Sequence, residues 1–494
     1  MSKADIQSSY KLFIGGEWRE ASDGVTFDVS CPSNGEKLSS CAQATKEDVD
    51  LAVKESWKAF ETWKKVTTSE RAKILNQIAD IIEENAEHLA MVESLDNGKP
   101  IRETLAVDIP LAVKHFRYFA GCILAEEGSA NVLDEQFLSI ILREPIGVVA
   151  QIVPWNFPFL MAAWKLAPVL ASGCCTVIKP SSDTSLSVLE LARLTQDVVP
   201  KGVFNVITGA GSKSGQYMLD HEGFSKLTFT GSTEVGRQVG LSAAERIIPA
   251  TLELGGKSAN IYFPDCNWEQ AIDGAQLGIL FNQGQVCCAG SRIFVHEDIY
   301  DKFLEDVVEA FNKVKVGVSW DKETQMGSIV NKNQLNKVLE CVEEGKKEGA
   351  RVICGGEAIT DGELAKGCFM KPTLLADVTN DMRIAQEEIF GPVACIIKFK
   401  EEEEVIRMAN DSEFGLGGAV WTKDINRAIR VARGVETGRM WVNTYNQIPE
   451  GAPFGGYKKS GIGRETHKVI LEHYTQIKNI MINLSESPSG FYNN

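Results

Sequence analysis

Two cysteines stand side by side in the stretch FNQGQVCCAG, residues 281–290. A cysteine attacks carbon as its thiolate, and a free thiol with a pKa of about 8.5 needs a helix N-terminus, a cation or a base to ionise near neutrality. Neighbouring side chains diverge in a strand and in a helix, so only one of Cys287 and Cys288 can face a given site. Taken alone, the pair also fits core packing, where free cysteine is common.

A carboxylate in an apolar setting is the second feature. Glu253 lies in TLELGGKSAN, residues 251–260, between apolar neighbours and before two glycines. Such surroundings raise the pKa of a carboxyl group, which suits it to act as a general base near neutrality. A strand glutamate at the edge of a sheet explains the same pattern equally well.

A third candidate, Asn156, lies in PWNFPF, residues 154–159. The flanking prolines restrict the chain, and the Asn156 amide is placed to donate a hydrogen bond to a developing oxyanion. Without other evidence, this segment is an ordinary turn.

Three loops have the composition of nucleotide-binding turns. FTGSTEVG (229–236) follows a predicted strand and opens a predicted helix, where Ser232 and backbone amides can meet a pyrophosphate. IKPSS (178–182) ends another strand and carries Lys179, which can reach a ribose or a phosphate. TGAGSKSG (208–215) only approximates GxGxxG and is weak alone. A doubly wound sheet binds nucleotides at the carboxyl ends of its parallel strands, where these loops fall.

The elements that must position these residues follow from hydrophobic periodicity. Residues 49–96 repeat apolar positions every three or four residues, which predicts helices that end at Asn97-Gly98. From Ile146 onward, short β-branched runs alternate with helical ones, which is typical of parallel βαβ units. We therefore expect an α/β protein with two doubly wound, Rossmann-like domains in series.

The chain of 494 residues is too long for a single core. We assign 1–125 and 146–255 to a dinucleotide-binding domain and 256–460 to a catalytic domain. The stretches 134–145 and 472–492 read as extended strands that fit neither, and isolated strands need a partner. We therefore assign 126–145 and 461–494 to a small β arm for oligomerisation, and expect a homodimer or homotetramer.

The amino-acid composition limits the classes of partner that the protein is expected to bind. Acidic residues outnumber basic ones by 67 to 51, for a net charge of −16, which argues against nucleic acid and anionic membranes. The most apolar run is interrupted by Trp164, Lys165 and Pro168, so we expect no membrane span. Twelve scattered cysteines and the absence of signal-peptide features favour reduced thiols in the cytoplasm. The six histidines show no metal-binding spacing, so we expect no metal.

The whole chain resembles the aldehyde dehydrogenase superfamily. The resemblance rests on FIGGEW, PWNFP, IKP, FTGST, LELGGKS, GQVCCAGSR, EEIFGPV and PFGGYKKSGIGRE, which occur in the order typical of that family. The glutamate and cysteine motifs lie 34 residues apart, as the family has them.

The resemblance assigns catalytic roles. In GQxC the cysteine is the nucleophile, so Cys287 attacks an aldehyde and forms a thiohemiacetal, whose oxyanion the Asn156 side chain and the Cys287 amide hold. Hydride transfer to the nicotinamide leaves a thioester, and Glu253 activates the water that hydrolyses it. The alternatives are a CoA-acylating dehydrogenase, which would not need Glu253, and a catalytically silent binding or structural relative, against which the intact trio argues.

The resemblance also implies the cofactor, NAD or NADP, and the residues that bind it and the aldehyde. The cofactor residues are Ile152, Val153, Pro154, Trp155, Lys179, Ser182, Gly211, Phe229, Gly231, Ser232, Val235, Leu254, Gln334, Lys337, Glu388 and Phe390. The substrate pocket is formed by Phe157, Met161, Trp164, Phe281, Val286, Cys288 and Phe454, with the loop 444–454 at its mouth. This lining suggests small to medium aliphatic or aromatic aldehydes.

One position departs from the family pattern. Strictly NAD-dependent relatives often carry a glutamate three residues after the lysine of IKP, whereas this chain has Ser182. A carboxylate repels a 2′-phosphate, and serine can donate a hydrogen bond to one. We therefore expect NADP to be accepted, unless other residues set the preference.

Overall fold

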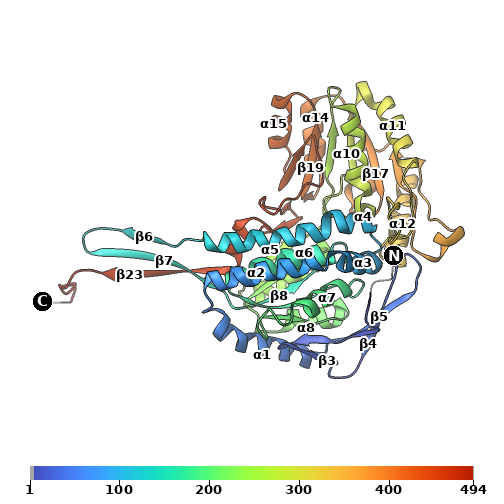
Figure 1. Cartoon of the computed structure of the whole chain (residues 1–494). Coiled ribbons are helices and arrows are strands. Elements are labelled where there is room, and N and C mark those ends of the chain that lie inside the picture. Colours follow the sequence, from blue (N-terminus) through green and yellow to red (C-terminus); the bar gives the residue numbers. More distant parts are fainter. Residues whose placement is uncertain (1–4, 493–494) are drawn as a thin grey trace.

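The computed structural model describes residues 5–492. Two mostly parallel sheets with helices packed around them form the body, and a narrow arm of three strands projects from it (Figure 1). This arrangement confirms the predicted α/β class with a small β arm.

The first sheet has the strand order β22-β12-β11-β8-β9-β10-β2-β3, in which β8 to β12 run parallel. The chain moves outward from β8 to β9 and β10, and then returns to place β11 on the other side of β8. Loops that leave β8 and β11 therefore diverge and open a crevice at the carboxyl ends of these strands. The strands are β2 (Leu12–Ile14), β3 (Glu17–Arg19), β8 (Val148–Ile152), β9 (Cys175–Lys179), β10 (Phe204–Val206), β11 (Lys226–Thr230), β12 (Ala250–Glu253) and β22 (Gly461–Ile462).

The second sheet has the order β15-β16-β17-β14-β13-β19-β20, and only its edge strand β15 is antiparallel. Its inner strands are almost entirely buried, as expected for a parallel sheet with helices on both faces, whereas the edge strands β15 and β20 are partly exposed. They are β13 (Ala259–Tyr262), β14 (Arg292–His296), β15 (Arg351–Cys354), β16 (Thr373–Ala376), β17 (Val393–Phe399), β19 (Gly417–Trp421) and β20 (Arg439–Val442).

Capping residues mark where the helices around the first sheet begin and end. Thr45 and Thr67 form capping boxes with Asp48 and Glu70 at the starts of the first two helices. Gly98 ends the third with φ 90°, where an added Cβ would clash with Ser328. These helices are α1 (Lys46–Trp63), α2 (Thr68–Glu84), α3 (Ala86–Asn97), α4 (Ile101–Glu103), α5 (Ile109–Leu124), α6 (Pro158–Ser172), α7 (Leu186–Thr195), α8 (Gln216–Asp220), α9 (Thr233–Glu245) and α16 (Leu471–Tyr474), with π-helical turns η1 (Thr104–Asp108) and η2 (Gly211–Gly215).

The helices of the second unit follow the same alternation with strands. They are α10 (Trp268–Leu280), α11 (Tyr300–Asn312), α12 (Lys332–Glu348), α13 (Arg383–Gln386), α14 (Glu402–Asn410) and α15 (Ile425–Gly434). Short 3₁₀ turns are η3 (Phe281–Gly284), η4 (Glu297–Ile299), η5 (Gly362–Lys366) and η6 (Lys468–Ile470). One small sheet contains β1 (Ser9–Tyr10), β4 (Thr26–Ser30) and β5 (Lys37–Ala42), and another contains β18 (Phe414–Gly415) and β21 (Tyr457–Lys458).

The arm is an antiparallel sheet of β6 (Ser129–Val132), β7 (Phe137–Pro145) and β23 (Thr475–Asn483), in the order β23-β7-β6. Its pairing runs without interruption from Thr475 opposite Pro145 to Asn483 opposite Phe137. Two segments more than 300 residues apart thus supply each other's missing strand partner (Figure 1).

The chain crosses from the first sheet to the second between β12 and β13, close to the predicted boundary at residue 255. It also returns, because β22 pairs with β12 of the first sheet and α16 packs against α6. Part of the stretch 461–494 therefore lies in the first unit and not in the arm. The division into domains otherwise stays a prediction.

Candidate active site

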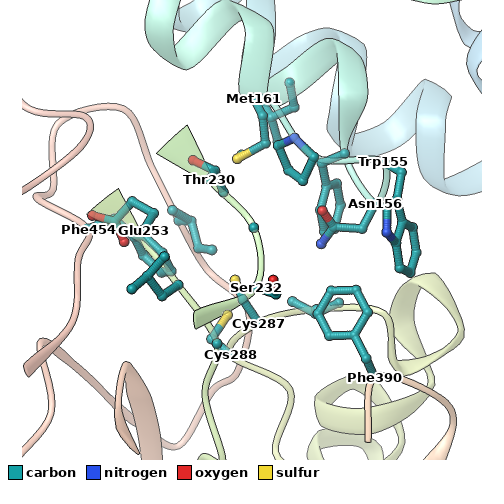
Figure 2. Close-up of a pocket in the computed structure, with 18 of the residues that line it drawn as sticks. Trp155, Asn156, Met161, Thr230, Ser232, Glu253, Cys287, Cys288, Phe390 and Phe454 are labelled. Atoms are coloured by element: carbon teal, nitrogen blue, oxygen red, sulfur yellow. The ribbon is translucent and has the colours of Figure 1, made fainter. Parts of the chain in front are cut away.

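The three predicted catalytic residues line one cavity between the two sheets. Asn156 follows β8 and Glu253 ends β12, so both come from the carboxyl edge of the first sheet. Cys287 comes from the turn that precedes β14 of the second sheet. Figure 2 shows Glu253, Asn156 and the Cys287 sulfur on different walls of this cavity. Because the residues come from two sheets, the cavity exists only where the two units meet.

The two cysteines occupy different environments. Cys287 is partly exposed, whereas Cys288 is fully buried, with its Sγ 3.9 Å from Asn446 Oδ1. The Tyr445 hydroxyl donates to the Cys288 carbonyl at 2.8 Å, and Gly417 packs closely against the Cys288 side chain. Both cysteines line the cavity, but only Cys287 has room for a reacting group.

The surroundings of Cys287 disfavour its thiolate. The adjoining Cys288 thiol raises its pKa well above the ordinary value, and burial and the carboxyl groups of Glu388 and Glu253 raise it further. No cause of the opposite sign acts on it, so the thiol must lose its proton to a base during attack.

Glu253 is a buried carboxyl group without a hydrogen-bond partner. Both of its oxygens are orphaned within the described part of the chain, and one lies against Gly455, where an added Cβ would be 2.9 Å away. Burial raises the pKa of Glu253 well above its usual range, and Glu465 raises it further, while Lys165 and Arg464 lower it. An unpartnered carboxyl group of raised pKa beside a thiol has the properties of a general base.

The Asn156 side chain is held by one of its two N–H groups. Its Nδ2 donates to the Gln285 carbonyl at 2.8 Å, and the side chain is 5 % exposed. The second N–H remains available to an oxygen in the cavity. The backbone N–H of Cys287 donates to no acceptor within residues 5–492. These two donors have the chemistry of an oxyanion site.

The crevice beside this trio suits a dinucleotide. Ser232 caps α9 through a hydrogen bond from the Val235 N–H to its Oγ, at 3.4 Å, and the helix N-terminus faces the crevice. The Thr233 hydroxyl is buried without a partner among the described residues. The rings of Trp155 and Phe390 meet edge to face, with their centres 5.0 Å apart, on one side of the cavity (Figure 2).

A second carboxyl group, Glu388, lies across the crevice. It accepts the Gly256 N–H at 3.0 Å, and an added Cβ on Gly255 would clash with it. Burial raises the pKa of Glu388 to about 7, while that hydrogen bond, Lys337 and Lys257 lower it. Unlike Glu253, this carboxyl group has a fixed partner that orients it.

Comparison with known proteins identifies the family. The model of the aldehyde dehydrogenase family matches residues 18–480. An aldehyde dehydrogenase of Vibrio cholerae serotype O1 is 49 % identical over 498 residues, covering 99 % of this chain and 98 % of the relative.

The chain belongs to the aldehyde dehydrogenase family.

Solved structures of the family share the fold. An aldehyde dehydrogenase of Bacillus cereus in complex with NAD+ is 44 % identical, with a TM-score of 0.95 over 97 % of this chain and 98 % of that one. A betaine aldehyde dehydrogenase of Staphylococcus aureus, also with NAD+, is 40 % identical, with a TM-score of 0.96 over 99 % of this chain and 97 % of that one.

The residues predicted for the cofactor fall into two groups. Nine line the catalytic cavity: Pro154, Trp155, Gly231, Ser232, Leu254, Gln334, Lys337, Glu388 and Phe390. Seven lie elsewhere, within or beyond the ends of β8 to β11: Ile152, Val153, Lys179, Ser182, Gly211, Phe229 and Val235. Lys179 ends β9, and Ser182 and Gly211 follow β9 and β10, outside the lining of the cavity. Their contact with the cofactor stays a prediction.

All seven residues predicted for the substrate pocket line the cavity: Phe157, Met161, Trp164, Phe281, Val286, Cys288 and Phe454. The structure adds Val107, Leu111, Leu160, Thr230, Gly255, Asn446 and Ile448. Asn446 and Ile448 belong to the loop that we expected at the mouth. Val107 comes from η1 and Leu111 from α5. In the sequence they are marked only as apolar positions of a helical stretch.

Within residues 5–492 no helix is long and apolar enough to cross a membrane, and no cluster of three or more metal-binding side chains is present. All twelve cysteines are free.

Proposed function

We propose that this aldehyde dehydrogenase, an oxidoreductase, uses Cys287, Glu253 and Asn156 to convert an aldehyde into a carboxylic acid through a thioester. The observation that carries the proposal is the meeting of a partly exposed thiol, an unpartnered carboxyl group and a side-chain amide in one largely apolar cavity. The cofactor is NAD+, which the B. cereus and S. aureus relatives bind.

The first step forms a carbon–sulfur bond. The Cys287 sulfur attacks the aldehyde carbon as its proton passes to Glu253, the carboxylate with free lone pairs in the cavity. The carbonyl oxygen becomes an oxyanion, which the free N–H of Asn156 and the Cys287 N–H stabilise. NAD+, when bound, supplies the acceptor for the hydride that leaves this carbon, and the product is a thioester on Cys287.

The second step breaks the same bond. Glu253 first releases the thiol proton to solvent, so that it is again a carboxylate. It then takes a proton from water, and the water oxygen attacks the thioester carbon. The carbon–sulfur bond then breaks, the carboxylic acid leaves, and the sulfur regains its proton. Two moderate barriers replace one high barrier.

The cavity favours an uncharged aldehyde of small to medium size. Apart from Asn156, Asn446 and Glu253, the walls around Cys287 on the substrate side are mostly aromatic, aliphatic or sulfur-containing, and Phe157 and Phe281 stack at 6.0 Å. A panel of aliphatic, aromatic and quaternary-ammonium aldehydes, followed by NADH absorbance, tests this preference. Higher kcat/KM for the quaternary-ammonium aldehyde than for the others would contradict it.

The Cys287 role is tested by the rapid first turnover. Mixing wild-type enzyme, NAD+ and aldehyde should release a burst of NADH, which Cys287→Ala should abolish. Cys288→Ala, the matched control, should retain the burst, since that sulfur only forms a wall. Loss of the burst in Cys288→Ala with retention in Cys287→Ala would reverse the assignment.

We also propose that the enzyme accepts NADP+. Ser182 is partly exposed, and the nearby Asp183 carboxylate is engaged by Asn331 at 3.1 Å. Burial lowers the pKa of Lys179 to about 8, and its Nζ donates to the Pro180 carbonyl at 2.9 Å, which leaves other N–H donors for a ribose or phosphate. Steady-state kinetics test this: kcat/KM with NADP+ below about one per cent of that with NAD+ would refute it, a gap of about 2.7 kcal/mol.

A further inference from the structure

A closed set of hydrogen bonds joins the loop that carries Asn156 to the turn that carries Cys287. The Asn156 Nδ2 donates to the Gln285 carbonyl at 2.8 Å. The Asn282 Nδ2 donates to the Asn156 carbonyl at 2.7 Å and to the same Gln285 carbonyl at 3.3 Å. Gln285 lies two residues before Cys287, so this ring ties the oxyanion donor to the nucleophile.

Asn282 reaches both carbonyls through an unusual backbone. Its φ of 46° and ψ of 39° are left-handed, and Gln283 follows with φ 56°. Asparagine is among the few residues other than glycine that adopt this conformation readily. Two left-handed residues in sequence persist only where the surroundings over-determine them, and they concentrate at functional sites.

Helices of the first unit supply that support. The Glu103 carboxyl group at the end of α4 accepts the Asn282 N–H at 2.9 Å. Asn97, at the end of α3, donates from Nδ2 to the Trp155 carbonyl at 2.6 Å and to the Asn156 carbonyl at 3.4 Å. Each loop is thereby anchored to a buried helix end, the Cys287 turn to α4 and the Asn156 loop to α3. Asn282 itself is fully buried and does not line the cavity.

We propose that Asn282 is a positioning residue, whose side-chain amide sets the distance between the Asn156 donor and the Cys287 sulfur. It touches neither aldehyde nor cofactor and acts through the two loops. The inference rests on the proposed function, because it assumes the roles given to Asn156 and Cys287. Small displacements of such a donor lower rates strongly, by about 100-fold for 1 Å.

The test removes the amide while keeping the backbone. Asn282→Gly permits the left-handed conformation, so the protein should fold. We expect the rate constant of the NADH burst to fall about 10- to 100-fold, with the NAD+ dissociation constant, measured by protein fluorescence, nearly unchanged. A burst rate within about twofold of wild type, or an equal weakening of NAD+ binding, would overturn the role.

A second variant separates hydrogen bonding from packing. Asn282→Asp keeps the shape but, when ionised, repels both carbonyls, whereas its protonated form donates one O–H. Relative to wild type at each pH, its burst should be slowest at high pH and recover in part as the pH is lowered. A purely structural role predicts the same relative loss at every pH, and that result would overturn the proposal.

Controls separate this inference from the proposed function. Asn443 is also left-handed, with φ 53°, and its amide donates to the Thr422 carbonyl at 2.9 Å outside the cavity. Asn443→Gly should leave the burst within about twofold, and a loss equal to that of Asn282→Gly would count against the proposal. If wild type shows no burst, the proposed function fails; if Asn156→Ala loses the burst while Asn282→Gly keeps it, only the positioning role fails.

Discussion

Two carboxyl groups in one cavity differ because their neighbours differ. Burial raises the pKa of Glu388 to about 7, while a hydrogen bond from a backbone N–H and two nearby lysines lower it. Glu253 has no hydrogen-bond partner among the described residues, and burial together with the nearby Glu465 raises its pKa well above its usual range. Environments that differ in this way assign different tasks to chemically identical groups. We infer that Glu253 exchanges protons and that Glu388 serves as a fixed acceptor for the cofactor.

The role of Glu253 predicts which step its removal blocks. Glu253→Gln keeps the side-chain volume but cannot take a proton from water. We expect the NADH burst to keep its amplitude but to form more slowly, because Glu253 also takes the thiol proton. Steady-state turnover should fall further, by about 10²- to 10⁴-fold, measured by stopped-flow and steady-state absorbance. Wild-type hydrolysis should accelerate as pH rises through the raised pKa of Glu253, because only the carboxylate is a base, and the variant should lose this dependence.

Glu388→Gln provides the matched comparison within the cavity. It removes a charge beside the cofactor crevice and leaves the water-activating group intact. We expect a higher KM for NAD+ and no selective loss of the hydrolytic step. Equal loss of burst and turnover in Glu253→Gln would contradict the assignment of Glu253 to hydrolysis.

At the scale of elements, buried polar side chains join the ends of α3, α4 and η1 to the catalytic loops. Lys99 forms an ion pair with Asp108 and lies 3.8 Å from the centre of the Phe157 ring. Glu93 accepts the Phe159 N–H at 3.3 Å, and Glu103 accepts the Asn282 N–H. Helix ends thus hold backbone that is not itself in helix or strand, which keeps the loops rigid.

Glu103 makes the stability of this region depend on pH. Burial raises its pKa to about 8, while Lys99 and the Asn282 N–H lower it. At pH values between the pKa of Glu103 in the unfolded chain and its pKa in the native state, native Glu103 is protonated and unfolded Glu103 is not. The free energy of unfolding therefore falls as pH rises, by at most about 1.4 kcal/mol per pH unit. The stabilising contribution is present below the unfolded pKa and is lost as pH passes through about 8.

The neutral isostere Glu103→Gln should remove this dependence. The free energy of unfolding, measured with denaturant at a series of pH values, should fall less steeply with pH in the variant than in wild type. The variant should therefore gain stability relative to wild type toward pH 8. Parallel curves for the two proteins would show that Glu103 does not hold a proton in the native state.

At the scale of the whole molecule, the arm exposes apolar side chains that the chain does not cover. Val132 is 76 % exposed, Ile477 65 % and Met481 54 %. The arm's outer strands, β6 and β23, also leave edges open to pairing. Apolar groups gathered on a projecting element mark an interface. We therefore retain the proposal of a homodimer or homotetramer in which arms pack against neighbouring copies.

A charge on this arm should disrupt the assembly. Ile477→Asp places a carboxylate on β23, and we expect a smaller species by sedimentation velocity, because desolvating an unpaired charge is unfavourable. Ile429→Asp on α15, a position 50 % exposed, is the matched control and should leave the mass unchanged. An unchanged mass for Ile477→Asp would argue against an interface on this strand.

The sequence by itself predicted the features that depend on local hydrophobic pattern and on short motifs, namely the helices, the strands and the catalytic residues. Periodicity located the strands and helices, since alternation and capping act over a few residues. The motifs around Asn156, Glu253 and Cys287 marked one site, and the structure brings these three residues into one cavity. Of the opening pair of thiols, Cys287 is the one with open space beside it.

The tertiary structure decided what depends on distant parts of the chain. Val107 and Leu111 line the cavity because α5 packs beside α6, and β22 returns to the first sheet from the far end of the chain. Asn282 looked like one polar residue in a turn until its contacts with Asn156 and Glu103 were seen. Local sequence sets the shape of an element, but packing between elements decides which side chains meet.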